Sequence, residues 1–207
     1  PQSTGKTSFS ESILYQSGII NRKGSIEDRN TVSDYTEIEQ EKGFSVFSSL
    51  MYCEWKNSKI NFIDTPGLDD FVGEVLSALQ VGDAAVIFVN AANSVEFQTN
   101  IIFDRAKELK KPISFLVNNL DIENINFDKI HNDLVGTFGP KAIILQYPLN
   151  SGAGFNEIVD LIKMKLLKFS EDGTYTEKEI PANFTDKANQ LRSQLIDSIS
   201  ETDEELM

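Results

Sequence analysis

The chain has 207 residues, and its content of 40% apolar and 10% aromatic residues is typical of a folded globular protein rather than a disordered one. It contains no run of about 18 apolar residues, so the pattern excludes a membrane-spanning helix. The net charge of −13 argues against a broad RNA-binding surface, and contact with nucleic acid would have to be local or come from other parts of the protein. Acidic residues gather in a final helix and tail, which is typical of a solvated helix face: Asp186, Asp197, Glu201, Asp203, Glu204 and Glu205.

The chain begins with P-Q-S-T-G-K-T, the end of the phosphate-binding pattern G-x-x-x-x-G-K-[ST]. Gly5 allows the backbone to turn its N–H groups toward phosphate oxygens, Lys6 supplies a cation for the β- and γ-phosphates, and Thr7 supplies a hydroxyl for Mg²⁺. A helix at 7–16 would direct its positive end at the same anions. By itself, a G-K-T triplet could equally belong to an ordinary surface loop.

The first glycine of the pattern would precede Pro1, and so would the strand that feeds the phosphate loop. We therefore expect a fragment of a longer protein, with an open edge in its sheet, a mobile N-terminus and no tightly retained nucleotide.

The next elements predict a hairpin. A polar stretch at 21–43 is too long for a tight connection. Two strand-like segments follow at 49–55 and 59–64, and the Asn57-Ser58 pair between them favours a two-residue turn. The second of these segments is apolar enough to predict a buried strand. The single cysteine, Cys53, cannot form an internal disulfide and is expected in the core of a cytosolic protein.

Helices and strands then alternate, with helices at 71–79 and 98–109 and strands at 84–90 and 113–118. This order is typical of a parallel sheet with helices on both faces. Beyond Asp121 the pattern predicts a helix at 127–138, a strand at 142–146, an apolar segment at 158–169 and a turn at 171–174. A last helix is expected at 183–199, with Leu191, Leu195 and Ile199 on its apolar face.

Two further motifs follow strands. D-T-P-G at 64–67 offers Asp64 to Mg²⁺, usually through water, and a glycine, Gly67, whose N–H can swing toward a γ-phosphate. N-N-L-D at 118–121 offers Asn118 and Asp121 to the edge of a base, and the carboxylate suits the N1–H and exocyclic amine of guanine. Taken singly, the first could be a turn and the second a helix cap. In this order, each at the end of a strand, they predict a guanine-nucleotide-binding fold.

With these motifs, the chain resembles the GTPase domain of bacterial translation elongation factor G over nearly its whole length. Residues 36–46 look like the acidic run and R-G-I-T-I switch segment of that family, and residues 64–71 look like its D-T-P-G-H-V-D-F. Residues 159–165 match V-D-L-x-K-M-K in the insertion within the family's GTPase domain, which separates the chain from elongation factor Tu and small GTPases. Tetracycline-resistance ribosome-protection proteins are close relatives and remain the nearest alternative.

The resemblance implies an α/β phosphate-loop NTPase fold, with a doubly wound, mostly parallel sheet and an α+β insertion subdomain. Residues 1–121 would form the GTP-binding domain without its first strand, and residues 122–207 the insertion. It also implies a cytoplasmic, monomeric GTPase that binds GTP or GDP with Mg²⁺ and promotes ribosomal translocation. Contacts with ribosomal RNA and stalk proteins would be made through the full-length factor, and no membrane partner is expected. Residues 21–47 and 67–71 would be ordered or released with the γ-phosphate.

The resemblance also assigns the site. Lys6 and Gly67 would act at the γ-phosphate, and Thr7, Ser45 and Asp64 would hold the metal. The nucleotide contacts would be Ser3, Thr4, Gly5, Lys6, Thr7, Ser8, Asp64, Gly67, Asn118, Asn119 and Asp121.

Four of these positions depart from the family pattern. Leu68 replaces the histidine that positions the attacking water, Asn119 replaces the lysine beside the base, and Ser3 replaces an aspartate of the phosphate loop. Ser45 replaces the switch threonine but keeps a hydroxyl for Mg²⁺. The only histidine, His131, falls in the insertion, where a surface or capping role is expected. GTP binding is therefore expected to be retained but weakened, and hydrolysis to be weak or absent.

The loop at 150–155 resembles the S-A motif that contacts the guanine O6 in ordinary GTPases. Because the insertion match follows it at once, we expect the base-contact loop beyond Met207. Two alternative functions stay open: a ribosome-protection or rescue GTPase, and a GTP-binding module that does not hydrolyse its nucleotide.

Overall fold

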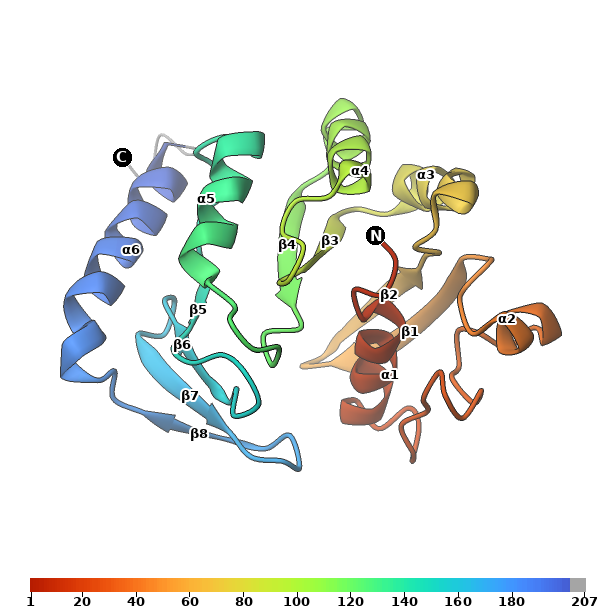
Figure 1. The fold of residues 1–207 in the computed structure, drawn as a ribbon, viewed down its shortest axis with the longest axis horizontal. Coiled ribbons are helices and arrows are strands. Elements are labelled where there is room, and N and C mark those ends of the chain that lie inside the picture. The colour runs from red at the N-terminus through yellow and green to blue at the C-terminus, as the bar shows by residue number, and fades with distance from the viewer. Residues whose placement is uncertain (202–207) are drawn as a thin grey trace. The chain divides into compact units, whose positions relative to one another are not determined.

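The computed structural model describes residues 1–201 and divides the chain into two compact units, Pro1–Asn118 and Asn119–Met207. Of the predicted acidic tail, Asp203, Glu204 and Glu205 lie outside the described residues. The division falls just before the predicted boundary at residue 121. Each unit combines helices with strands, and Figure 1 follows the chain through them. Within the described residues, no helix is both long and apolar enough to cross a membrane.

The first unit contains a hairpin and a parallel strand pair. Its elements are α1 (Lys6–Gln16), α2 (Glu37–Lys42), β1 (Ser49–Trp55), β2 (Ser58–Asp64), a 3₁₀ turn (Asp69–Phe71), α3 (Val72–Val81), β3 (Ala85–Asn90), α4 (Phe97–Glu108) and β4 (Ile113–Asn118). β1 and β2 pair antiparallel, whereas β3 and β4 pair in parallel. The predicted elements are therefore present, with small shifts at their ends.

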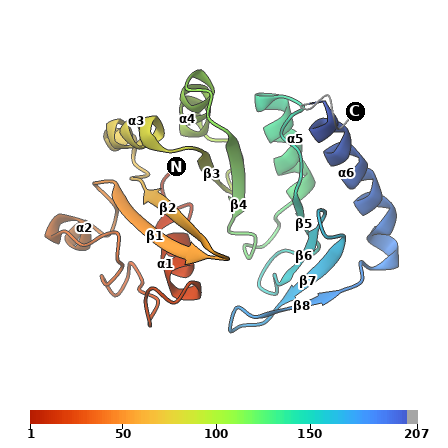
Figure 2. The ribbon, with the colours of Figure 1, turned by 180° about the vertical axis from the view of Figure 1, so that it is seen from behind.

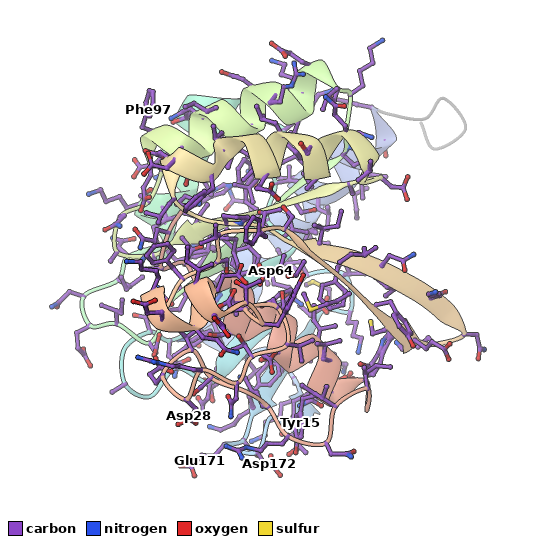
Figure 3. The ribbon with its side chains drawn as sticks, turned by 90° about the vertical axis from the view of Figure 1, so that its right-hand side faces the viewer. Tyr15, Asp28, Asp64, Phe97, Glu171 and Asp172 are labelled. Carbon is purple, nitrogen blue, oxygen red and sulfur yellow. The ribbon has the colours of Figure 1, made fainter. Side chains whose placement is uncertain are left out.

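The hairpin corrects two predictions. Trp55 pairs with Ser58, so the turn lies at Lys56-Asn57, one residue earlier than predicted. Both turn residues have positive φ, 47° and 64°, as a type I′ turn requires. β2 is also not a buried strand, because Ile60 is 45% exposed and only the last residue of β2, Asp64, is fully buried. In the described residues β2 pairs with β1 alone, and the turn end of the hairpin projects from the unit (Figure 3).

Helices cover both faces of the parallel pair, as predicted. Ala85 of β3 packs in a core cluster with Val75 of α3 and Ala106 of α4. On the other face of β3, the ring of Phe88 meets that of Phe9 on α1, with centroids 5.3 Å apart. Figures 1 and 2 show α3 and α4 on one side of β3 and α1 on the other.

Parallel pairing is confined to β3 and β4 in the described residues, so one strand pair represents the predicted mostly parallel sheet. β2 and β3 are not hydrogen-bonded to each other. The buried Cys53, 3% exposed, confirms the expected core position on β1.

The second unit packs two helices against an antiparallel sheet. Its elements are α5 (Phe127–Phe138), β5 (Gln146–Pro148), β6 (Glu157–Asp160), β7 (Lys165–Phe169), β8 (Tyr175–Lys178) and α6 (Ala182–Ser200), and the strands pair in the order β5-β6-β7-β8. Its core contains Val159 of β6, Leu161 in the turn after β6, and Ala188 and Leu195 of α6. This is the α+β arrangement that was predicted for the insertion.

Two segments of this unit differ from the sequence interpretation. The predicted strand at 142–146 is wrong, since the strand begins at Gln146 and the apolar residues before it pack into the core as a loop. The ring nitrogen Nε2 of His131 lies 2.9 Å from the carbonyl oxygen of Ala142 in that loop. The histidine therefore holds the loop against α5. The apolar segment 158–169 is a hairpin rather than one element, and the predicted turn at 171–174 follows it. Ile199, predicted on the apolar face of α6, is 45% exposed.

Candidate nucleotide-binding site

The phosphate loop is closed by its own side chains. The Thr4 hydroxyl donates to the Pro1 carbonyl at 3.0 Å, and the Lys6 ammonium donates to the same oxygen at 2.6 Å. Gly5 has φ 83° and precedes α1 without a side-chain cap, so the first N–H groups of the helix face the loop. A side chain at Gly5 would place Cβ 2.3 Å from the amide nitrogen of Asn118. The loop therefore needs glycine here, and it presents backbone N–H groups as an anion site would.

Asn118 occupies the end of β4 and holds the loop. Its side-chain amide donates to the Thr4 carbonyl at 2.9 Å. From the sequence, Asn118 was predicted at the base edge only, and the structure gives it a contact with the phosphate loop. Ser3 and Ser8, also predicted as nucleotide contacts, are exposed on the loop and on the first turn of α1.

Four oxygen-bearing side chains converge at the start of α1. The Thr7 hydroxyl donates to the Asp64 carboxylate at 2.9 Å and lies 3.4 Å from the Ser45 hydroxyl. Ser45 in turn donates to the carboxylate of Asp34 at 2.7 Å. The three residues predicted to hold the metal are thus brought together from α1, β2 and the segment between α2 and β1. Asp34 was not predicted, although a carboxylate among hydroxyl residues ahead of Ser45 is a signal that could have found it.

This cluster fits Mg²⁺. Hydroxyl and carboxylate oxygens are the ligands that Mg²⁺ prefers. Asp34 and Asp64 are each 5% exposed, and Figure 3 shows Asp64 inside the first unit. Burial raises the pKa of both carboxyls above the ordinary value, against hydrogen bonds from Ser45 and Thr7 respectively. Two buried carboxylates that are costly to ionise are stabilised by a divalent cation, because its charge compensates theirs.

Lys6 is the cation already in the site. Burial lowers its pKa from the ordinary value, and the charges of Asp64 and Glu96 oppose that shift. A buried ammonium gains from a phosphate anion for the same reason, because the anion replaces the lost hydration. Lys6 therefore gives the loop a buried ammonium that a nearby anion would stabilise.

Gly67 closes on the phosphate loop. A side chain there would place Cβ 2.7 Å from the Lys6 ammonium and 2.8 Å from the Pro1 carbonyl oxygen. Pro66 before it is fully buried, and Leu68 after it is half-buried. The turn thus holds its backbone beside the Lys6 ammonium. Leu68 brings no donor or acceptor to this position.

A further buried acid, Glu39, organises the segment before β1. Glu39, 1% exposed on α2, accepts hydrogen bonds from the amides of Val46 at 3.0 Å and Phe47 at 3.1 Å. It also forms a capping box with Thr36. Burial by itself would raise the pKa of Glu39. Hydrogen bonds from Thr36, Phe47 and Val46 outweigh this effect and hold the pKa below its ordinary value. Glu39 fixes the backbone just after Ser45, and from the sequence it was expected only as part of an acidic run.

Asn119 and Asp121 begin the second unit and are described there. Asn119 has φ 63° and Asp121 is exposed. The loop that resembles the S-A motif lies against this segment, with the Gly152 amide donating to the Leu120 carbonyl at 2.8 Å and the Ala153 amide to the Glu123 carboxylate at 3.3 Å. Within its unit, the loop thus contacts residues on either side of Asp121.

Known proteins match both the sequence and this fold. Residues 2–201 match the family described as the elongation factor Tu GTP binding domain. The chain belongs to this family. Membership implies binding of a guanine nucleotide, and it confirms the α/β phosphate-loop GTPase fold.

Two relatives confirm the resemblance to elongation factor G. An elongation factor G-like protein of Thermotoga maritima is 37% identical over 204 residues, which cover 99% of this chain and 28% of the relative. Elongation factor G of Mycoplasma pneumoniae is 36% identical over 205 residues, which cover 98% of this chain and 30% of the relative. A crystal structure of a Thermus thermophilus protein superposes with a TM-score of 0.91 at 29% identity, over 99% of this chain and 30% of that protein. The chain thus spans less than a third of the length of each of these proteins.

Proposed function

We propose that the chain is the GTP-binding part of an elongation factor G-like protein that promotes ribosomal translocation. The convergence of Thr7, Ser45 and Asp64 beside the Lys6 phosphate loop carries this proposal. Residues 1–121 would be the GTP-binding domain and residues 122–207 its insertion. The full-length factor would be a cytoplasmic monomer that contacts ribosomal RNA and stalk proteins.

The residues of the site have separate roles in binding. The phosphate loop and Lys6 would bind the phosphates of GTP or GDP, and Thr7 and Ser45 would hold Mg²⁺, with Asp64 and Asp34 around it. When bound, Mg²⁺ would neutralise charge on the β- and γ-phosphates. Asp121 would accept two hydrogen bonds from guanine. The segments 21–47 and 67–71 would respond to the γ-phosphate, because Ser45 and Gly67 both lie at the loop.

Hydrolysis is proposed to be weak or absent. The isobutyl group of Leu68 cannot hold a water for attack on the γ-phosphate, whereas Lys6, Gly67 and the loop amides can still bind GTP. Binding and turnover should therefore separate. A GTP-binding module without hydrolysis is the alternative that follows from this. A protection or rescue GTPase of the tetracycline-resistance type is a separate alternative, which rests on the resemblance to that related family.

Nucleotide titration tests the binding proposal. Fluorescent GDP and GTP should bind the full-length protein more tightly with Mg²⁺ than with a chelator, and Lys6→Ala should lower the affinity at least about tenfold, since a charged hydrogen bond to phosphate is lost. The matched control is Lys59→Ala on the projecting hairpin, which should bind as the wild type does. Equal binding by both variants would remove the phosphate loop from the proposal.

Two ribosome assays separate the functional alternatives. Single-turnover GTP hydrolysis with and without ribosomes distinguishes an enzyme from a binding module. A translocation assay with and without tetracycline distinguishes an elongation factor from a protection factor, because only the latter restores elongation in the presence of the drug.

A further inference from the structure

Glu11 is a buried carboxylate on the helix of the phosphate loop. It lies on α1 one turn after Thr7, on the same face, and is 1% exposed. One carboxylate oxygen accepts from the Gly24 amide at 2.8 Å, and the other accepts from the Val32 amide at 2.6 Å. Burying a charged group costs free energy unless it is hydrogen-bonded. Both backbone contacts are therefore needed for Glu11 to stay where it is.

The segment between the two contacts is closed on itself. A side chain at Gly24 would place Cβ 2.5 Å from the Asn30 carbonyl oxygen and 2.9 Å from the Glu11 carboxylate, so glycine is required at this approach. The Ser25 amide donates to the Asn30 side chain at 2.8 Å. Asp28, between the contacts and labelled in Figure 3, is exposed. Residues 24–32 thus form a loop attached to α1 at both ends by one side chain.

The residues after Val32 lead to the oxygen-bearing side chains at the start of α1. The next carbonyl, that of Ser33, accepts from the Ser49 hydroxyl at 2.7 Å. Asp34 follows directly and accepts from Ser45, which lies 3.4 Å from Thr7. The contacts form a ring that leaves α1 at Glu11 and returns to α1 at Thr7.

We infer that Glu11 is a positioning residue for the magnesium–nucleotide site, an inference that rests on the proposed function. By holding Val32, it sets the place of Asp34, and through Asp34 that of Ser45, relative to Thr7 on its own helix. Because Glu11 makes this attachment rather than the nucleotide, residues 24–32 stay on α1 in both nucleotide states. The part of the chain that responds to the γ-phosphate then begins after Val32 instead of at Asn21.

The test is the Mg²⁺ dependence of nucleotide binding by Glu11→Gln in the full-length protein. Glutamine keeps the shape but turns an NH₂ group toward one of the two backbone amides, so one hydrogen bond is lost. The Mg²⁺ concentration for half-maximal binding of fluorescent GTP should rise about tenfold, while affinity in chelator should change less than about twofold. Glu27→Gln, an exposed glutamate on the same loop, should leave both unchanged.

Three outcomes decide the matter. An equal loss with and without Mg²⁺ would show that Glu11 only supports the fold, and it overturns the inference. A wild-type protein that binds nucleotide independently of Mg²⁺ overturns the proposed function and the inference with it. If Glu11→Gln does not fold, Gly24→Ala moves the loop off an intact carboxylate, and it should give the same shift in Mg²⁺ dependence and faster amide exchange at Val32.

Discussion

At the scale of residues, the site depends on buried polar groups that hold one another. Thr7, Asp34, Ser45 and Asp64 form one connected set of hydrogen bonds, and each member is costly to bury alone. Such a set has one arrangement in which all members are satisfied. A change to one residue here therefore removes a partner from the other buried members of the set.

Leu68→His should restore hydrolysis. A histidine can hold the attacking water, and positioned groups of this kind contribute roughly 10²–10⁴ in rate. Ribosome-stimulated GTP hydrolysis by the full-length protein should rise by about that factor, with GTP affinity unchanged. Leu68→Met is the control, since it adds no comparable donor. A wild-type rate in the ordinary range of elongation factor G, not improved by histidine, would show that Asp69, Asp70 or ribosomal RNA does this work.

Asp121→Asn should change the choice of base. The aspartate can accept two hydrogen bonds from guanine, whereas xanthine carries an oxygen at C2 and suits an amide donor. A site that leaves polar groups unpaired with the wrong base discriminates strongly. Competition between GTP and XTP for the full-length protein measures the switch. An unchanged preference for GTP would remove Asp121 from base recognition.

Asp34→Asn should stabilise the chain in the absence of Mg²⁺. Burial raises the pKa of Asp34 above its ordinary value of 3.8. Between 3.8 and the raised pKa, the folded state binds more protons than the unfolded state, so the free energy of unfolding falls as the pH rises through this range. Each unit of raised pKa corresponds to about 1.4 kcal/mol. Thermal unfolding in chelator at pH 4 and pH 7.5 should show a smaller difference between the two pH values for the variant. The same difference in both proteins would contradict a raised pKa.

At the scale of elements, the two units are stabilised by separate cores. The first unit relies on Val75, Leu79, Ala85 and Ala106 between α3, α4 and β3. The second relies on Val159 of β6, Leu161 in the turn after β6 and Leu166 of β7, which pack with residues of α6. Adjacent residues, one buried in a core and the next exposed, should therefore contribute very differently to the free energy of unfolding.

Leu161→Ala should destabilise the second unit by about 2–5 kcal/mol, because Leu161 is fully buried and its loss leaves a cavity. Ile162→Ala is the matched control: Ile162 is 62% exposed and should change stability by less than about 0.5 kcal/mol. Urea unfolding followed by circular dichroism measures both. Similar losses in the two variants would mean that the core does not lie where the structure places it.

At the scale of the whole molecule, charge limits what the chain can bind. A net charge of −13 repels the phosphate backbone of RNA, and phosphate contacts provide most non-specific affinity. We expect no retention of ribosomal RNA fragments by the chain at roughly 150 mM salt, measured by filter binding. Salt-dependent binding in that assay would reveal a local basic surface that the total charge hides. In that case, this chain would itself contribute to the contact between the proposed factor and the ribosome.

The sequence by itself determined the ligand class and the order of elements. G-K-T, D-T-P-G and N-N-L-D are local patterns whose chemistry can be read without a structure, and the strand at 113–118 and the helix at 127–138 occur with the predicted ends. Local periodicity is enough to predict such elements, because the spacing of apolar residues within the segment identifies a helix or a strand. It was not enough for the strand predicted at 142–146, since apolar residues there serve the core from a loop.

Only the tertiary structure decided which backbone groups the polar side chains bind. Asn118 donates to Thr4, and Glu11 accepts from Gly24 and Val32, contacts between residues far apart in the sequence. The exposure of β2 was likewise invisible, because a strand is buried by its neighbours and not by its own composition. Hydrogen bonds and burial at these positions are properties of packing, and no pattern of spacing within one segment contains them.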